Sequence, residues 1–295
     1  MKYKIFFFLS SVLVFVFLPL GSNMTRAINQ TESELLLQHI EILRQEVFNL
    51  QTLLSNSQLR QKINAPSYLA INLADNSVIL NKNPDQPYTI ASITKLMNAV
   101  ITLENIDPEQ TITLTEEMLE PLGGSPTLFL GLNISAENLL KASLTQSTND
   151  ASEALALFMG KERFLSLMNQ KAKELGMANT IFYDAHGLNP DNHSTTADLA
   201  KLLAYIYKNH PEILSITKSN NLWLPDQGGK LLKFINLNGF YPLSAFIGGK
   251  TGYLTEAKHT SASIFNINGK NVAIVVLYSK NYQADIFAIL RELKY

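Results

Sequence analysis

The sequence predicts an α/β fold in which helices flank an antiparallel sheet and a helical insertion separates its strands. Two hairpin patterns predict the sheet, one near the start of the domain over 68–83 and one near its end over 261–279. Amphipathic periodicity between them predicts the insertion. Because a largely helical segment separates the hairpins, their strands are expected to share one sheet. An N-terminal hydrophobic segment and a short coiled-coil-like helix precede this domain.

The first residues have the pattern of an export segment. Lys2 and Lys4 precede an uncharged apolar run over 5–20, as a basic cytoplasmic flank precedes an exported hydrophobic stretch. The run is intermediate in length between the core of a signal peptide and a membrane-spanning helix. Residues 1–27 are therefore interpreted as a signal peptide or an N-terminal membrane anchor, with the anchor preferred. Either would place the rest of the chain outside the cytoplasm.

Residues 28–63 are predicted to form an amphipathic helix. Its apolar residues are spaced four and three apart: Leu36, Ile40, Leu43, Val47, Leu50 and Leu54. About three heptads are the lower limit for a coiled coil. Two interpretations stay open for 36–54: a helix packed on the domain, and a stalk or self-association helix. Asn64-Ala65-Pro66 closes the segment, so the domain is expected to span 64–295.

The elements of the domain follow from local patterns. Two strands are predicted around the Asp75-Asn76 turn and two more around Asn268-Gly269, a dipeptide suited to tight hairpins. Helices are predicted over 92–104, 135–146, 150–159, 162–175 and 196–208, with a final helix at "ADIFAILREL".

Composition excludes several classes of protein. A net charge of −1, from 24 basic and 25 acidic residues, provides no overall field that would attract nucleic acid. Cys is absent, which excludes disulfides, thiol chemistry, cysteine metal sites and a lipidated cysteine. Hydrophobic residues make up 46% of the chain, which is enough for a core.

The tetrapeptide "SITK" occurs twice, at 92–95 and 215–218. Ser92 follows a Pro-containing loop and opens a helix, and Lys95 lies one turn further on the same face, within reach of the hydroxyl. The positive end of the helix and burial would disfavour the ammonium form of Lys95, which makes it a plausible base. Pro211 suits a first helical turn, so Ser215 is expected inside a helix. The second copy is therefore interpreted as not catalytic.

Two further motifs follow in order. Ser147-Thr148-Asn149 is expected in a loop between two helices, and Lys250-Thr251-Gly252 comes just before the last hairpin. Together with 92–95 they form the set typical of penicillin-recognising serine enzymes.

From about residue 67 the chain resembles the D-alanyl-D-alanine carboxypeptidases, serine DD-peptidases among the low-molecular-mass penicillin-binding proteins. "SLTQSTNDASEALA", "NTIFYDAHGL" and "NLNGFY" before "GGKTGY" carry the resemblance beyond the three motifs. It implies a DD-peptidase/β-lactamase-like fold for 64–295. Lys258 departs from the family, which commonly has Gly at this position, and this departure affects the turn beside the third motif.

The resemblance implies a catalytic role for four residues. Ser92 would be the acylated nucleophile and Lys95 the base that takes its proton. Ser147 would relay a proton to the leaving amine, and Asn149 would hold the substrate amide. No metal or organic cofactor is implied.

It also implies the substrate-binding residues. Lys250 and Thr251 would receive the terminal carboxylate of D-alanine or of a β-lactam. Gly252 would leave room for substrate along a strand, and the N–H groups of Ser92 and Tyr253 would form the oxyanion hole.

Other polar residues near the motifs are interpreted as structural. Asp150 fits a helix first turn. His186 is expected to be a turn residue and not a base, since no partner is evident. Glu256 and Lys258 are expected to be solvated.

The expected function is a D-Ala-D-Ala carboxypeptidase that acts on peptidoglycan stem peptides and is acylated by β-lactam antibiotics. A D,D-endopeptidase that cleaves peptidoglycan crosslinks is the alternative. A class A β-lactamase would need a glutamate where Ala185 stands, and a non-catalytic membrane-tethered scaffold would not need Lys95 and Lys250 together. The expected location is the extracytoplasmic side of a bacterial membrane, in the periplasm or cell envelope.

Overall fold

The computed structural model describes residues 43–46 and 62–295. Residues 43–46 are helical. The segment predicted over 1–27 and most of the helix predicted over 28–63 lie outside the described residues. Within the described ranges, no helix has the length and apolarity needed to cross a bilayer.

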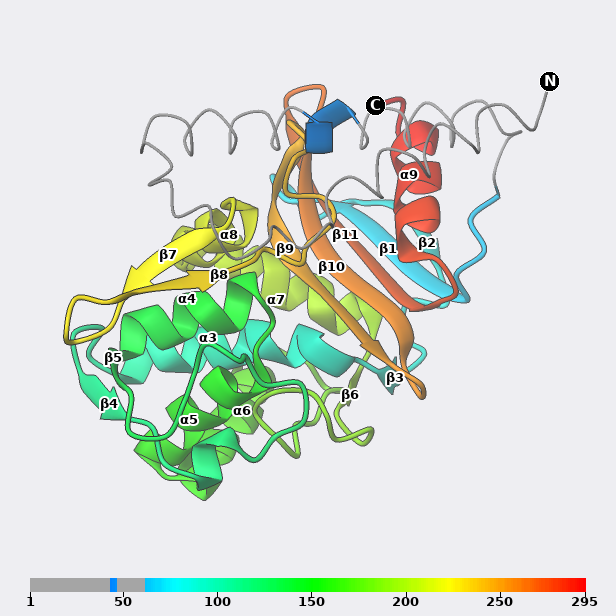
Figure 1. The fold of residues 1–295 in the computed structure, drawn as a ribbon. Helices are drawn as coiled ribbons and strands as arrows, with labels where there is room; N and C mark the ends of the chain where they lie inside the picture. Colours follow the sequence, from blue (N-terminus) through cyan, green and yellow to red (C-terminus); the bar gives the residue numbers. More distant parts are fainter. Residues whose placement is uncertain (1–42, 47–61) are drawn as a thin grey trace. The chain divides into compact units, whose positions relative to one another are not determined.

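The domain is built on one five-stranded antiparallel sheet with the order β2-β1-β11-β10-β9 (Figure 1). Its strands are β1 (Ser67–Asn72), β2 (Val78–Lys82), β9 (Phe246–Leu254), β10 (Lys258–Ile267) and β11 (Lys270–Ser279). β1 pairs with β11, with Ser67 opposite Leu277. The two predicted hairpins therefore share one sheet, as the sequence predicts.

Alternating side chains of the sheet divide the core into two parts. Ala70, Ile274 and Val276 point to one face, where they pack with α9 (Tyr282–Glu292) and a group of phenylalanines. Leu69, Val275 and Leu277 point to the other face and join the core of the helical insertion. Figure 1 shows α9 and the insertion on opposite sides of the sheet. This two-residue period is what a sheet buried on both faces requires.

The insertion contains the five helices predicted by range and a sixth, where Pro211 predicts a helix around Ser215. They are α3 (Thr94–Asn105), α4 (Ala136–Thr145), α5 (Asn149–Met159), α6 (Lys161–Glu174), α7 (Thr196–Asn209) and α8 (Pro211–Lys218). Side-chain caps fix several starts: Ser135 accepts a hydrogen bond from the N–H of Asn138, and Thr195 accepts one from the N–H of Asp198. Each predicted boundary lies within two residues of the observed one.

The insertion also contains strands that the helical pattern does not predict. Three two-stranded ribbons pair β3 (Tyr88–Thr89) with β6 (His193–Ser194), β4 (Thr111–Thr113) with β5 (Asn133–Ser135), and β7 (Leu222–Pro225) with β8 (Leu231–Phe234). The expectation of an all-helical middle is therefore wrong. Strands of two to four residues are too short to show a period.

Candidate active site

Ser92 lies in a short 3-10 turn, η1 (Ala91–Ile93), that leads directly into α3. The segment before it is held at both backbone groups of Ile90, whose N–H donates to the carbonyl of Asn192 at 3.0 Å and whose carbonyl accepts from Thr260 Oγ1 at 3.0 Å. Ala91 has a φ of +50°, which is rare for a residue with a side chain. The fixed segment and this sharp turn together set the position of Ser92 at the start of α3.

Two glycines leave room for this turn. A Cβ on Gly187 would lie 2.1 Å from the carbonyl oxygen of Ala91, and one on Gly252 would lie 2.7 Å from the nitrogen of Ser92. The backbone of β9 and the loop around Gly187 therefore approach the nucleophile segment more closely than any other residue type would allow.

Lys95 is one turn beyond Ser92, as the sequence predicts. Its Nζ lies 3.1 Å from Ser92 Oγ and 2.6 Å from Asn149 Oδ1, and it also bonds the carbonyl oxygen of His186. Two of these three groups can only accept hydrogen bonds, whereas the serine hydroxyl can also donate. A neutral amine has two N–H donors and one lone pair, so it matches this set with the lone pair directed at Ser92.

Burial favours that neutral form. Lys95 is completely buried, and burial lowers the pKa of its ammonium well below the usual value, with the nearby charge of Lys250 as a further cause. The carboxylates of Asp184 and Asp150 act in the opposite direction. Because burial and Lys250 outweigh them, Lys95 is suited to accept a proton from Ser92.

The loop between α4 and α5 contributes the second motif. Asn149 is fixed at both ends of its amide, since Nδ2 donates to the carbonyl of Leu122 while Oδ1 accepts from Lys95. Ser147 has a φ of +60°, and its hydroxyl has no hydrogen-bond partner within residues 62–295. Asp150 accepts the N–H of Ser125 at 2.7 Å, so the expectation of a structural role for it is confirmed.

The third motif lies on β9, the last strand in the sheet order. Lys250 is buried, and burial lowers its pKa to about 7. Its Nζ donates to the carbonyl of Thr251 at 2.8 Å. Further along the strand, Gly252 abuts Ser92, and Tyr253 is 58% exposed with its ring 4.7 Å from that of His259.

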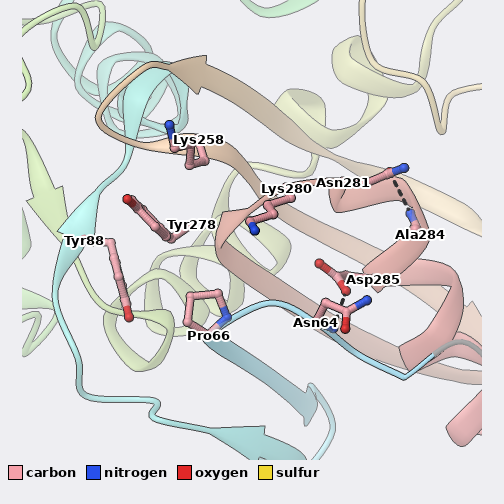
Figure 2. A pocket seen from close by; sticks show the side chains of 9 residues that line it. All are labelled: Asn64, Pro66, Tyr88, Lys258, Tyr278, Lys280, Asn281, Ala284 and Asp285. Carbon is pink, nitrogen blue, oxygen red and sulfur yellow. Dashed lines mark hydrogen bonds between the residues drawn. The ribbon is translucent and has the colours of Figure 1, made fainter.

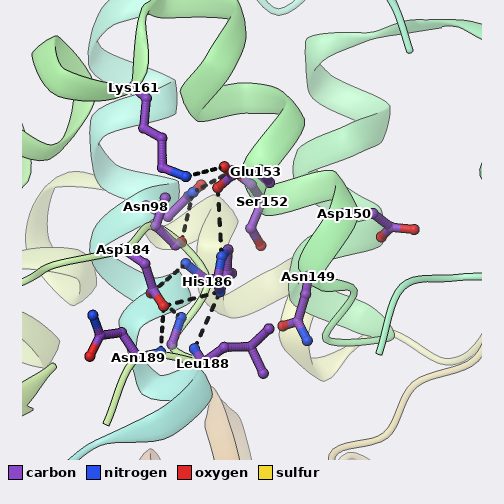
Figure 3. Close-up of polar contacts among 12 residues, drawn as sticks. Asn98, Asn149, Asp150, Ser152, Glu153, Lys161, Asp184, His186, Leu188 and Asn189 are labelled. Carbon is purple, nitrogen blue, oxygen red and sulfur yellow. Dashed lines mark hydrogen bonds and ion pairs between the residues drawn. The ribbon is translucent and has the colours of Figure 1, made fainter. Parts of the chain in front are cut away.

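The loop of residues 184–189 is the part of the site that the sequence analysis does not assign. Asp184 organises it by accepting the N–H groups of His186, Gly187 and Asn189 (Figure 3). This loop presents the carbonyl of His186 to Lys95 and brings Gly187 against Ala91. The Asp and Gly of "DAHGLN" predict a turn. The sequence does not show which backbone carbonyl of that turn would contact Lys95, because every residue has a carbonyl.

The side chain of His186 has partners, so the expectation that it has none is wrong, although it does lie in a turn. Its Nδ1 lies 3.2 Å from the nitrogen of Leu188 and 3.2 Å from Oδ2 of Asp184, so both tautomers of the neutral ring have a partner at this atom. Nε2 lies 3.6 Å from Oε2 of Glu153, whose other oxygen binds Lys161 (Figure 3). Burial lowers the pKa of His186, which favours this neutral ring.

The second SITK copy lies in α8, as expected. Ser215 is exposed and donates to the carbonyl of Pro211, four residues earlier in the helix. Thr217 is buried and accepts the N–H of Gly249 at 2.9 Å. This copy therefore anchors α8 to β9. Its serine and its lysine, Ser215 and Lys218, are both exposed, whereas Lys95 is completely buried.

Comparison with known proteins identifies the family. Residues 54–281 match the family model described as D-alanyl-D-alanine carboxypeptidase, peptidase family S11. The chain belongs to this family of serine peptidases. A D-alanyl-D-alanine endopeptidase of Haemophilus influenzae is 34% identical over 224 residues, which cover 74% of this chain and 76% of that protein.

Two further relatives bear on the architecture of this S11 peptidase. The D-alanyl-D-alanine carboxypeptidase DacF of Bacillus subtilis is 32% identical over 223 residues, covering 72% of this chain and 57% of DacF. The chain thus spans little more than half of that relative. Penicillin-binding protein D2 of Listeria monocytogenes, solved in a cefotaxime-bound form, superposes with a TM-score of 0.69 and 26% identity over 79% of this chain and 97% of that one.

No group of three or more His, Asp or Glu side chains in the described ranges could hold a metal ion. The residues at the start of α3 support acyl transfer, because the hydroxyl of Ser92 lies 3.1 Å from the buried amine of Lys95.

Proposed function

We propose that this protein is a serine-type D-Ala-D-Ala carboxypeptidase that acts on peptidoglycan stem peptides through an acyl-enzyme. The observation that carries the proposal is the environment of Lys95, a buried amine 3.1 Å from a serine hydroxyl and bonded otherwise only to acceptors. Such an amine can activate the hydroxyl at neutral pH without a histidine.

In the acylation step, Ser92 Oγ attacks the carbonyl carbon of the penultimate D-alanine while its proton moves to Lys95 Nζ. The N–H groups of Ser92 and Tyr253 stabilise the oxyanion that forms. When the C–N bond breaks, the departing D-alanine nitrogen takes a proton through the hydroxyl of Ser147, and Lys95 returns to its neutral form. Water then hydrolyses the ester and restores Ser92.

Substrate orientation follows from the charge on β9. Lys250 in its ammonium form, with Thr251, binds the terminal carboxylate, and Asn149 holds the amide of the substrate. The peptide then lies along β9, with the scissile bond beside Gly252 and Ser92.

A D,D-endopeptidase is the second candidate, and one observation favours it. The Haemophilus relative named D-alanyl-D-alanine endopeptidase is 34% identical over 74% of this chain. Mass spectrometry of purified cell-wall peptides after incubation with the protein separates the two. Loss of one D-alanine from pentapeptides supports the carboxypeptidase, whereas conversion of crosslinked dimers to monomers supports the endopeptidase.

The nucleophile is tested by substitution. Ser92→Ala is expected to abolish both peptide cleavage and labelling by fluorescent penicillin. Ser215→Ala is the matched control, because it changes the same tetrapeptide at an exposed position and is expected to shift stability by about 0.5 kcal/mol or less. Labelling that persists in the Ser92 variant and disappears in the Ser215 variant would refute the assignment.

Release of bound penicillin is expected to be slow. A deacylating glutamate of the class A β-lactamase type would fall at Ala185, a buried residue whose side chain offers no base. Rapid turnover of benzylpenicillin would contradict this expectation.

The proposed location is the extracytoplasmic side of a bacterial membrane. Lys2, Lys4 and the apolar run over 5–20 support export, and a peptidoglycan substrate lies outside the cytoplasmic membrane. Membrane attachment by residues 1–27 and self-association through 36–54 are part of the same proposal.

A further inference from the structure

A pocket of about 650 Å³ opens at one end of the sheet, beside the segment that leads to Ser92 (Figure 2). Its walls come from distant parts of the chain, including Asn64 before β1, Tyr88 in β3, Lys258 at the start of β10, Tyr278 and Lys280 at the end of β11, and Asp285 in α9. None of these residues belongs to the three catalytic motifs.

The register of the sheet places this pocket close to the catalytic groove. Lys258 pairs with Leu254 on β9, two positions beyond Gly252, which abuts Ser92. Two strand positions correspond to about 7 Å. Tyr88 is only four residues before Ser92 in the same segment. The pocket therefore lies at the end of the sheet toward which a peptide bound along β9 extends past Tyr253.

The proposed binding of the substrate carboxylate by Lys250 sets the direction in which the peptide runs along β9. If Lys250 binds the C-terminal carboxylate and the scissile bond lies beside Gly252, the residues upstream of that bond run toward Leu254, away from Lys250. The pocket then faces the residue two positions before the terminal D-alanine, which is the third residue of a pentapeptide stem.

The residues that line the pocket carry a net positive charge, because two lysines face one aspartate. Within residues 62–295, neither Lys258 nor Lys280 has a carboxylate within 4 Å. Asp285 is the acidic residue in the wall, and both of its oxygens are engaged: Oδ1 accepts the N–H of Asn64 and Oδ2 accepts the hydroxyl of Ser279, each at 2.6 Å. Two ammonium groups therefore remain available for an anionic ligand.

Backbone strain is concentrated in the same wall. Lys258 has a φ of +51° and Tyr278 a φ of +56°, values that bulky side chains rarely adopt. The register of β10 and β11 shifts between His259 and Ser261, opposite Tyr278. Such bulges redirect side chains next to functional sites. Here Tyr278 stacks on Tyr88 with 5.4 Å between ring centroids.

Lys258 is half-buried, and its backbone is in the left-handed region. Gly adopts this conformation without the steric cost that a side chain adds. This chain places a lysine there in spite of the conformational cost. A strained residue retained in a pocket wall is an observation from which function can be inferred.

We propose that this pocket is a subsite for a carboxylate on the third residue of the stem peptide, so that the protein prefers stems with diaminopimelate over stems with lysine. The inference rests on the proposed peptidase function, which supplies the direction of the bound peptide. Lys258 and Lys280 attract the carboxylate, and the stacked Tyr88 and Tyr278 rings form an apolar wall for the side-chain stem.

Two pentapeptides that differ only in diaminopimelate or lysine at the third position test the proposal. At low salt, the unaltered protein is expected to show about 5-fold higher kcat/KM for the diaminopimelate peptide than for the lysine peptide, because its KM for the diaminopimelate peptide is lower. Most of this preference should disappear at high salt. Lys258→Gly with Lys280→Ala should remove the preference and leave penicillin acylation unchanged. Lys270→Ala, an exposed lysine at the opposite end of β10 and β11, is the control and should keep it.

Thermal unfolding excludes damage to the fold as a cause. Lys258→Gly removes the steric cost of the left-handed conformation at this position. The melting temperature of this variant is therefore expected to equal or exceed that of the unaltered protein. Equal kcat/KM for both peptides in the unaltered protein, or a preference that survives in the double variant, would overturn the subsite while leaving the peptidase function intact. Failure to cleave either peptide or to react with penicillin would overturn both.

Discussion

Burial has opposite chemical consequences for the two lysines of the site. Lys95 must be neutral to accept a proton, and burial lowers its pKa in the useful direction. Lys250 must be charged to bind a carboxylate, yet burial lowers its pKa to about 7. The free protein therefore loses its carboxylate receptor as the pH rises through neutrality.

This conflict predicts the pH dependence of acylation. The rate constant for acylation by benzylpenicillin at low inhibitor concentration reports groups of the free protein. It should fall above a pH of about 7 as Lys250 loses its proton. Lys250→Arg keeps its charge at all accessible pH values, so its alkaline decline should disappear. A decline that is the same in both proteins would show that another group controls it.

At the scale of elements, the loop of residues 184–189 sets the geometry of the nucleophile through Gly187. Gly187→Ala is expected to lower the free energy of unfolding by about 3 kcal/mol or more, because its Cβ would meet the Ala91 carbonyl at 2.1 Å and its φ is +91°. Penicillin acylation should fall with it. Thermal unfolding and acylation rates measure the two effects.

Gly176→Ala is the matched control for this substitution. Gly176 also has a positive φ, +69°, but a Cβ there would have nothing within 4 Å. It should cost only the conformational penalty of about 1–2 kcal/mol and leave acylation unchanged. Equal losses of acylation in the two variants would contradict a specific role for the contact between Gly187 and Ala91.

The sequence predicts the elements with a strong period and misses those without one. The helices of the insertion, such as α7 with its apolar stripe, have 8 or more residues, and the two hairpins have turn dipeptides. The ribbons are too short for a pattern, and β9 contains three glycines that obscure its alternation. At the site, side chains such as Lys95 and Asn149 could be predicted, whereas the carbonyl of His186 could not, because every residue has one.

At the scale of the whole molecule, Asn64 and Ala65 connect the segment before β1 to the rest of the domain. A chain starting at residue 62 should be as stable and active toward soluble peptide as the full chain. One starting at Ser67 should be less stable by about 1–2 kcal/mol, because Asp285 loses the N–H of Asn64 and the buried Ala65 is removed. Urea unfolding of both chains checks this, and equal stabilities would show that residues 62–66 contribute nothing.

The pairing of β1 with β11 also determines when the site can form. Ser67 meets Leu277, and the hydroxyl of Thr260 fixes Ile90 from 170 residues away, so the nucleophile is held by strands that a ribosome makes last. Contacts this distant in sequence close slowly during folding. A nascent chain that lacks β10 therefore contains Ser92 and Lys95 but no reactive serine. Penicillin labelling during refolding would then report when the C-terminal strands join the sheet, and no label has to be attached to the protein beforehand.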